Sequence, residues 1–323
     1  MKYTNLGRSG LKVSRIALGC MSFGDTSRNF NQWSMPYEEA GGIFRTAVES
    51  GVTFWDTANF YAYGSSEEIV GRAMREYACR QDIVLATKVY FTMHDGPGGS
   101  GLSRKAILEQ IDASLTRLGT DYVDLYQIHR FDPDVPVEET MGALHDLVTA
   151  GKVRYLGASS MWAWQFAKLQ HTAKLNGWTQ FVSMQDQYSL IQREEEREMF
   201  GLLADLGVSS LPWSPLAKGR VARPWGSVTE RTRVDTAAEW ILPQHDNRPI
   251  VDAVQQVATA RGVTMAEVAM AWVLRNPVVA APIVGVTKPK HLLDAVAALD
   301  LELDDEEAAQ LERHYTPREP TGF

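Results

Sequence analysis

Residues 137–159 read VEETMGALHDLVTAGKVRYLGAS, and they combine one helical segment with one strand. Residues 137–150 have the apolar spacing of a helix, and Gly151 follows the last periodic residue, as is common at a helix C-terminus. Residues 153–159 form a short run typical of a buried strand. The same pairing of a helix with a short strand recurs along the chain, so it decides the fold class.

Eight candidate strands alternate with eight candidate helices. The strands are expected at residues 16–19, 53–56, 83–88, 122–129, 153–159, 181–185, 208–213 and 281–284. The helices are expected at residues 37–50, 66–76, 103–118, 137–150, 162–176, 193–206, 265–275 and 290–299. This alternation, without a break in composition, predicts one α/β domain over residues 1–323 that closes as a single (β/α)8 TIM barrel.

Three segments lie outside the repeat of strands and helices. An N-terminal β-hairpin cap is expected around residues 7–10, with residues 13–16 as its return strand. A long irregular stretch, 215–247, follows the seventh strand, and an extra C-terminal helix is expected from Asp304. The alternative fold is a doubly wound sheet, but the first strand-to-helix turn, 18–24, lacks the glycine fingerprint of that fold.

The composition excludes several classes of protein. Lys plus Arg number 32 and Asp plus Glu number 40, so the net charge is −8, which argues against a nucleic-acid binder with a basic face. The two cysteines, Cys20 and Cys79, have neither metal nor redox spacing, which favours a reducing compartment. The N-terminus lacks a secretory apolar segment, and no run of 18 apolar residues occurs. We therefore expect a cytoplasmic protein with no membrane or nucleic-acid partner.

Four reactive side chains fall at the ends of three adjacent predicted strands. Asp56 ends the second strand, Lys88 the third and His129 the fourth, while Tyr61 follows in the loop after Asp56. Chemistry in a barrel lies at the carboxyl ends of the strands, so these groups are expected on one rim. Each has a simpler interpretation alone, since Asp often caps a helix, Lys reaches solvent and His packs in a core. Their convergence favours a catalytic set.

The chemistry of this set points to reduction of a carbonyl. A phenol has a pKa near 10, and the ammonium of Lys88 is expected to lower the pKa of Tyr61, while Asp56 holds Lys88 charged. His129 would orient the substrate carbonyl or share the proton. These roles predict that Tyr61 acts as a general acid. Because no side chain supplies hydride, a nicotinamide cofactor is implied.

One glycine pattern elsewhere carries little weight. Gly96, Gly98 and Gly101 match G-x-G-x-x-G, but the pattern starts eight residues after the third strand and Pro97 interrupts it. We interpret it as a loop. The sequence has no Walker, zinc or G-x-S-x-G pattern, and no metal is expected.

The run DTANFYAYGSSE, 56–67, resembles the first signature of the aldo-keto reductases. Further runs resemble motifs of that family in the same order, namely YVDLYQIH at 122–129, RYLGASS at 154–160, PWSPL at 212–216 and PIVGVTKP at 282–289. The resemblance covers residues 3–313 and is similar to the bacterial and fungal aryl-alcohol-dehydrogenase-like branch. It implies a barrel that reduces an aldehyde or ketone with NADP(H), using Asp56, Tyr61, Lys88 and His129 as catalytic residues.

The resemblance also implies where NADP(H) binds. Ser159, Ser160 and Gln185 match contacts to the nicotinamide carboxamide, although Ser160 stands where the family usually has Asn. Trp213 matches the ring that stacks on nicotinamide, and Arg220 would clamp the pyrophosphate. The full set of implied cofactor contacts is Gly19, Met21, Asp56, Ser159, Ser160, Gln185, Trp213, Ser214, Pro215, Leu216, Lys218, Arg220, Gly285, Thr287, Lys288 and His291.

The segment expected at the 2′-phosphate departs from the family pattern. His291 stands where relatives often carry Arg, and Ala295 stands where they carry Asn. Lys288 and Lys290 lie in the same turn and could supply the missing charge, with Thr287 adding a hydroxyl. We therefore expect a softened preference for NADPH over NADH.

The rim loops are expected to line the substrate mouth with Trp33, Phe91, Arg130 and Trp162. Two alternative functions stay open at this point. The family includes potassium-channel β subunits, which bind cofactor but act through a partner. A barrel enzyme acting on sugar phosphates could use Lys88 as a Schiff base, although Asp56 would keep that amine protonated. The sequence leaves the substrate and the oligomeric state open.

Overall fold

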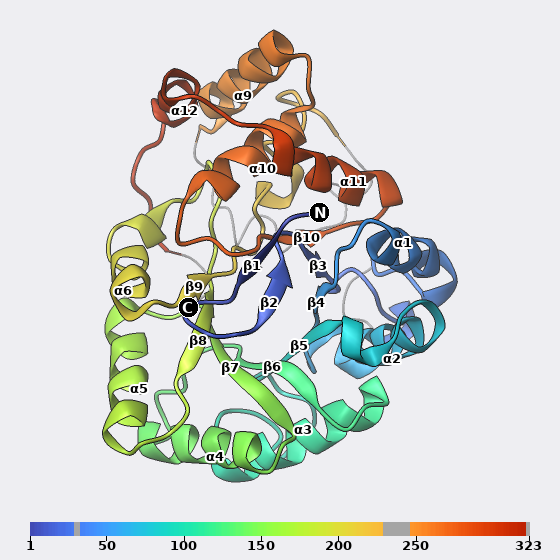
Figure 1. Ribbon diagram of the computed structural model, residues 1–323, viewed down its shortest axis with the longest axis vertical. Coiled ribbons are helices and arrows are strands. Elements are labelled where there is room, and N and C mark those ends of the chain that lie inside the picture. Colours follow the sequence, from blue (N-terminus) through green and yellow to red (C-terminus); the bar gives the residue numbers. More distant parts are fainter. Residues whose placement is uncertain (29–32, 229–245, 321–323) are drawn as a thin grey trace.

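Eight parallel strands curl into a barrel in the computed structural model, which describes residues 1–28, 33–228 and 246–320 (Figure 1). Around the sheet they follow the order β10 (Ile283–Gly285), β3 (Ala17–Gly19), β4 (Phe54–Asp56), β5 (Val84–Val89), β6 (Val123–Ile128), β7 (Val153–Ser159), β8 (Phe181–Gln185) and β9 (Ser209–Ser210). A parallel bridge between Trp213 and Ile283 joins the two edges, and the Ile283 amide donates to the Pro212 carbonyl at 2.8 Å. The predicted (β/α)8 fold is confirmed.

The helices surround the strands (Figure 1). Those of the repeat are α1 (Tyr37–Glu49), α2 (Ser65–Tyr77), α3 (Arg104–Leu118), α4 (Val137–Thr149), α5 (Ala163–Leu175), α6 (Met199–Leu206), α10 (Met265–Arg275) and α11 (Pro289–Ala297). Local signals set their ends: the Ser103 hydroxyl accepts from the Ala106 amide at the start of α3, and Gly119 adopts a left-handed conformation at its end. The expected extra C-terminal helix is α12 (Asp305–Glu312).

Two helix predictions need correction. The helix expected at 193–206 begins only at Met199, because residues 194–196 form a separate 3-10 turn in which Glu194 bonds the chain's C-terminal segment at Tyr315. Sequence reasoning also missed α9 (Arg248–Arg261), in which Pro249 is tolerated because it lies in the first turn. Residues 229–245 of the expected irregular stretch lie outside the described residues.

The strand boundaries differ by more than one residue at three places, and the simplest is the last strand, expected at 281–284 and found at β10. The hairpin consists of β1 (Tyr3–Asn5) and β2 (Lys12–Ser14). The return strand stops short of residue 16, where the Ser14 hydroxyl donates to the Ile16 carbonyl at 2.7 Å and the chain leaves the ladder. The strand expected at 208–213 is regular only over β9. Beyond β9 the ladder is interrupted because Pro212 has no amide hydrogen to donate.

The hairpin closes the amino-terminal end of the barrel. Leu6 and Val13 are fully buried and pack with Phe54 and Leu125 from inside the sheet. Solvent is thereby excluded from that end, which leaves the carboxyl ends of the strands as the place for a site.

Among the described residues no single helix is long and apolar enough to cross a membrane. Only α9 and α10 taken together have the length and composition for a span, and they are bent by 103°.

The loop between β4 and α2 is strained and tightly held. Ala62 and Tyr63 have φ of 46° and 48°, left-handed values that side chains other than glycine adopt at a cost of about 1 kcal/mol or more each. Arg28 donates to the Tyr63 carbonyl at 2.9 Å, and the Ser65 hydroxyl donates to the Ala62 carbonyl at 3.0 Å. These bonds fix the turn that directly follows Tyr61.

A buried ion pair anchors the same loop to the barrel wall. Arg117 on α3 donates from Nε to the Glu67 carboxylate at 2.6 Å, and the Thr87 hydroxyl donates to the other oxygen at 2.5 Å. Glu67 is fully buried, and its Arg117 partner lies so close to Gly64 that a Cβ there would approach Arg117 Cδ to 2.6 Å. The clamp therefore links α2, α3 and β5 beside Lys88.

We expect Arg117→Met to lower the free energy of unfolding by about 3 kcal/mol, because it leaves the Glu67 carboxylate buried without its cation. The matched control is Lys105→Met on the same helix, whose exposed pair with Glu109 contributes about 0.5 kcal/mol or less. Urea denaturation of both variants measures the difference. Equal losses would show that the Glu67 clamp contributes no more than a surface pair.

Candidate active site

The four predicted catalytic residues meet at the carboxyl ends of adjacent strands. Asp56 ends β4, Lys88 lies near the end of β5, and His129 directly follows β6. The Lys88 ammonium donates to Asp56 Oδ2 at 2.6 Å, to the Thr57 carbonyl at 2.8 Å and to the Tyr61 hydroxyl at 3.2 Å. The Tyr61 and His129 rings lie edge to face with centroids 5.7 Å apart.

Two amides hold the other oxygen of Asp56. Gln127 and Gln185 each donate from Nε2 to Asp56 Oδ1, at 2.9 and 3.0 Å. Sequence reasoning missed Gln127, although its position two residues before His129 places both side chains on the same inward face of the strand. With these bonds, the buried carboxylate is satisfied on both oxygens, as a buried ion pair requires.

Burial and neighbouring charges shift the pKa of Lys88 in opposite directions, and the same is true of Tyr61. Burial alone would lower the Lys88 pKa, but the charges of Asp56 and then Tyr61 outweigh it and raise that pKa, so the ammonium stays charged. Burial raises the Tyr61 pKa, and Lys88 only partly counteracts this effect. Lys88 thus lowers the Tyr61 pKa as expected, but burial outweighs this effect, so the net pKa lies above the ordinary value. The phenol is protonated at neutral pH.

His129 is neutral in this environment. Burial, followed by the charges of Lys88 and Arg130, lowers its pKa well below the ordinary value. Its Nδ1 is buried and makes no hydrogen bond within the part of the chain that the structure describes. The ring also contacts Phe91, with centroids 4.8 Å apart. The N–H of a neutral imidazole at this position can donate a hydrogen bond to a carbonyl oxygen.

The predicted nicotinamide contacts lie together at the ends of β7 and β8. Trp213 donates from its indole to the Ser160 hydroxyl at 3.1 Å, which gives this serine a partner other than a cofactor and orients the Trp213 ring. Ser160 has φ of 43°, and its hydroxyl lies 3.4 Å from that of Ser159. Gln185 uses Nε2 for Asp56, so its Oε1 can accept from a ligand amide. Hydroxyl, amide oxygen and a half-buried indole fit a nicotinamide carboxamide.

The segment after Trp213 forms a basic turn. Ser214, Ala217 and Lys218 all have left-handed backbone conformations, with φ between 48° and 55°. The Ala217 amide closes the turn by donating to the Ser214 carbonyl at 2.8 Å. Lys218 and Arg220 are half-buried on it. Cations on such a compact turn fit the charge of a pyrophosphate.

The start of α11 carries the predicted 2′-phosphate contacts. Lys288 is exposed immediately before the helix, whereas Lys290 is paired with Asp294 at 2.6 Å. Burial and then the Arg223 guanidinium lower the pKa of His291, so the imidazole is neutral. Arg223 was missed because it lies far away in sequence, after β9. The local positive charge therefore comes from Lys288 and Arg223 rather than from Lys290 or His291.

The remaining predicted cofactor residues lie on the same rim. Gly19 ends β3, and a Cβ there would come within 2.9 Å of Ile283. Gly285 ends β10 and is exposed. The others are the half-buried Met21, Leu216 and Thr287 and the buried Pro215.

The four predicted substrate contacts divide into two groups. Phe91 and Arg130 adjoin the catalytic residues: Arg130 donates to the His129 carbonyl at 2.5 Å, and its guanidinium lies 5.4 Å from the Phe91 ring centroid. Trp33 is half-buried ahead of α1, and Trp162 precedes α5 with 46% of its surface exposed. The structure thus places Phe91 and Arg130 beside His129.

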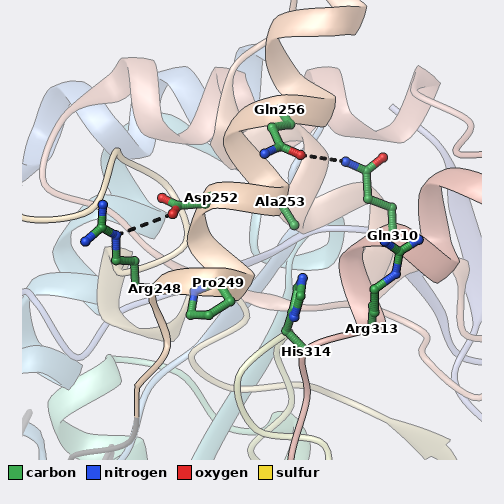
Figure 2. A pocket seen from close by; sticks show the side chains of 8 residues that line it. All are labelled: Arg248, Pro249, Asp252, Ala253, Gln256, Gln310, Arg313 and His314. Atoms are coloured by element: carbon green, nitrogen blue, oxygen red, sulfur yellow. Dashed lines mark hydrogen bonds and ion pairs between the residues drawn. The ribbon is translucent and has the colours of Figure 1, made fainter.

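A separate groove of about 610 Å³ lies between α9 and α12 (Figure 2). Some polar side chains that line it pair with one another: Arg248 forms an ion pair with Asp252, and Gln310 donates to Gln256. No predicted site residue lines it. In the ranges 1–28, 33–228 and 246–320, no group of three His, Cys, Asp or Glu side chains could hold a metal ion.

Comparisons with known proteins agree with the motifs. The model of the "Aldo/keto reductase family" matches residues 15–316. A versiconal hemiacetal acetate reductase of Aspergillus parasiticus is 44% identical, covering 98% of both chains. An aldo-keto reductase of Alternaria alternata is 42% identical over 99% of this chain and 93% of its own. A Schizosaccharomyces pombe protein named as an aryl-alcohol dehydrogenase is 40% identical over 98% and 96%.

These matches span nearly the whole chain at identities well above 30%. They confirm the resemblance read from residues 56–67 and from the later motifs, including its fungal aryl-alcohol-dehydrogenase-like relatives. The chain is an oxidoreductase that belongs to the aldo/keto reductase family.

Proposed function

We propose that this protein reduces an aldehyde or ketone to an alcohol with NADP(H), and that Tyr61 is the general acid. The observation that carries this proposal is the 3.2 Å contact between the Tyr61 hydroxyl and the Lys88 ammonium, which is itself bonded to Asp56 at 2.6 Å. A protonated phenol beside a fixed cation can release its proton in the transition state and be stabilised afterwards as phenolate. The reductase names of the relatives support the same reaction class.

Tyr61, Lys88 and His129 have different roles in the proposed proton transfer. A bound nicotinamide would supply hydride to the carbonyl carbon. Tyr61 donates its proton to the carbonyl oxygen, and Lys88 stabilises the phenolate that remains. His129, being neutral, hydrogen-bonds the carbonyl oxygen and aligns it with the Tyr61 hydroxyl. Solvent then returns a proton to Tyr61.

Cofactor binding is assigned to three groups of residues. Ser159 and the Gln185 Oε1 would hold the carboxamide, with the Trp213 ring against the nicotinamide. Lys218 and Arg220 would bind the pyrophosphate. Lys288 and Arg223 would attract the 2′-phosphate, which favours NADPH over NADH.

The buried ion pair argues against a Schiff-base mechanism on sugar phosphates. Lys88 is fully buried, and its pKa is raised above the ordinary value by Asp56 and Tyr61 despite burial. A charged ammonium is a poor nucleophile. The same residue is well suited to stabilise a phenolate, so proton transfer is the better role.

Tyr61→Phe is expected to lower kcat for an aldehyde by about a hundredfold to ten-thousandfold, because it removes the proton donor. NADPH binding should be retained because the Tyr61 hydroxyl is not one of the proposed cofactor contacts. Quenching of tryptophan fluorescence measures this binding. Reduction of a good aldehyde at the wild-type rate would show that another group is the acid.

Lys88→Met is expected to move the pH profile of alcohol oxidation to higher pH. In that direction Tyr61 must act as a base, so the rate rises with pH through the Tyr61 pKa. Because Lys88 lowers this pKa, its removal raises the pKa further and displaces the rising limb upward. The measurement is kcat against pH for both proteins. An unchanged profile would contradict the coupling.

Lys288→Ala and Arg223→Ala are each expected to weaken NADPH binding about three- to tenfold while leaving NADH binding nearly unchanged. Lys290→Ala should have a smaller effect because Asp294 already neutralises its charge. Fluorescence titration of both cofactors measures this, and added salt should reduce the NADPH preference. If wild type binds NADH as tightly as NADPH, NAD is the working cofactor.

A further inference from the structure

One charge beside the proposed reacting groups neither gives nor takes the proton in the transfer described above. Lys88 is matched by Asp56, but Arg130, immediately after His129, is not paired with any Asp or Glu in the part of the chain that the structure describes. Its Nη1 donates to the neutral His129 carbonyl, and its guanidinium lies over Phe91. Arg130 therefore gives the substrate side of the centre an uncompensated positive charge.

The next carboxylate along the chain after Arg130 is committed elsewhere. Asp132 accepts from the Leu102 amide at 2.8 Å through Oδ2 and from the Asp134 amide at 3.0 Å through Oδ1. Desolvation lowers the Arg130 pKa to about 10, so the guanidinium remains charged at neutral pH. A partly buried cation without a carboxylate is unfavourable for the fold and attractive to an anion.

The surroundings define what kind of anion would fit. Only one of the five guanidinium N–H donors is used by the bond to His129, so the planar fork can take a carboxylate with two hydrogen bonds. The guanidinium lies over the ring of Phe91, which is part of an aromatic surface: the Phe91 ring centroid is 4.9 Å from that of Phe60 and 4.8 Å from that of His129. Such a surface suits an apolar, especially aromatic, spacer.

We propose that Arg130 is a specificity-determining residue that selects carbonyl compounds bearing a carboxylate, joined to the carbonyl through an apolar spacer that packs on Phe91. This inference rests on the proposed function, since it concerns the substrate of the same site. It names a class of acid-bearing aldehydes and ketones, and it assigns to Arg130 attraction and orientation rather than proton transfer.

The test compares acids with their neutral esters. Wild-type kcat/KM with NADPH is measured for 3- and 4-carboxybenzaldehyde and for their methyl esters. The ester is at least as electron-withdrawing as the carboxylate, so any preference for the acid arises from binding. We expect the better of the two acids to exceed its ester by about tenfold or more, mainly through a lower KM.

Variants assign the preference to Arg130. Arg130→Gln should bring kcat/KM for the acid down to that for its ester while NADPH affinity stays close to wild type, and Arg130→Lys should retain part of the preference. Arg154→Gln is the control: it removes the same charge from an exposed position at the start of β7, the opposite end of the barrel. This control should keep the full preference.

The outcomes separate the two proposals. Reduction of the esters without a preference for either acid overturns the role of Arg130 but leaves the reductase function intact. A preference that survives in both Arg130 variants has the same consequence. If neither acids nor esters nor unsubstituted benzaldehyde are reduced with NADPH or NADH, both proposals fail. If Arg130→Gln does not fold, Arg130→Lys decides the question. A partial preference in Arg130→Lys, together with a wild-type preference that falls at high salt, supports charge recognition; a preference in wild type that salt leaves unchanged overturns it.

Discussion

The buried contact between Lys88 and Asp56 is the interaction on which the rest of the site depends. The Lys88 and Asp56 side chains are 0% and 2% exposed, so the ion pair forms where separate charges would be very unfavourable. Such a pair is tolerated only when its remaining hydrogen-bonding groups are satisfied, and here Thr57, Gln127 and Gln185 satisfy them. The pair in turn fixes one cation 3.2 Å from the Tyr61 hydroxyl. Its value to the protein lies in this placement more than in stability.

The surrounding structure holds a strained loop against that cation. Left-handed Ala62 and Tyr63 follow Tyr61 directly, so the phenol is carried by backbone that would relax if it were free. Arg28 holds the loop from one side, and the Glu67–Arg117 pair holds its far end against β5 and α3. Rigid positioning of a general acid contributes to catalysis because the reacting groups need not be ordered at the moment of reaction.

Positive charge is distributed along the rim in a way that suits two different anions. Lys218, Arg220, Arg223 and Lys288 lie after β9 and around β10, whereas Arg130 follows β6. In the sheet order these positions fall on different sides of the barrel mouth, with the Lys88–Asp56 pair between β4 and β5. This arrangement is consistent with a phosphate-bearing cofactor on one side and an acidic substrate on the other. The overall charge of −8 conceals this local basic rim.

The sequence by itself determined the barrel, the family and the convergence of the four proposed catalytic residues on one rim. Strand and helix periodicity is local, and parallel strands bring their carboxyl ends to one rim, so Asp56, Lys88 and His129 could be placed together without coordinates. Only the tertiary structure decided the rest, because it depends on contacts between distant residues and on burial. Gln127 reaches Asp56 across 71 positions, Arg117 reaches Glu67 across 50, and Trp213 closes the barrel on Ile283. The sign of the Tyr61 pKa shift is a balance between desolvation and the Lys88 charge, and residue types alone do not say which is larger.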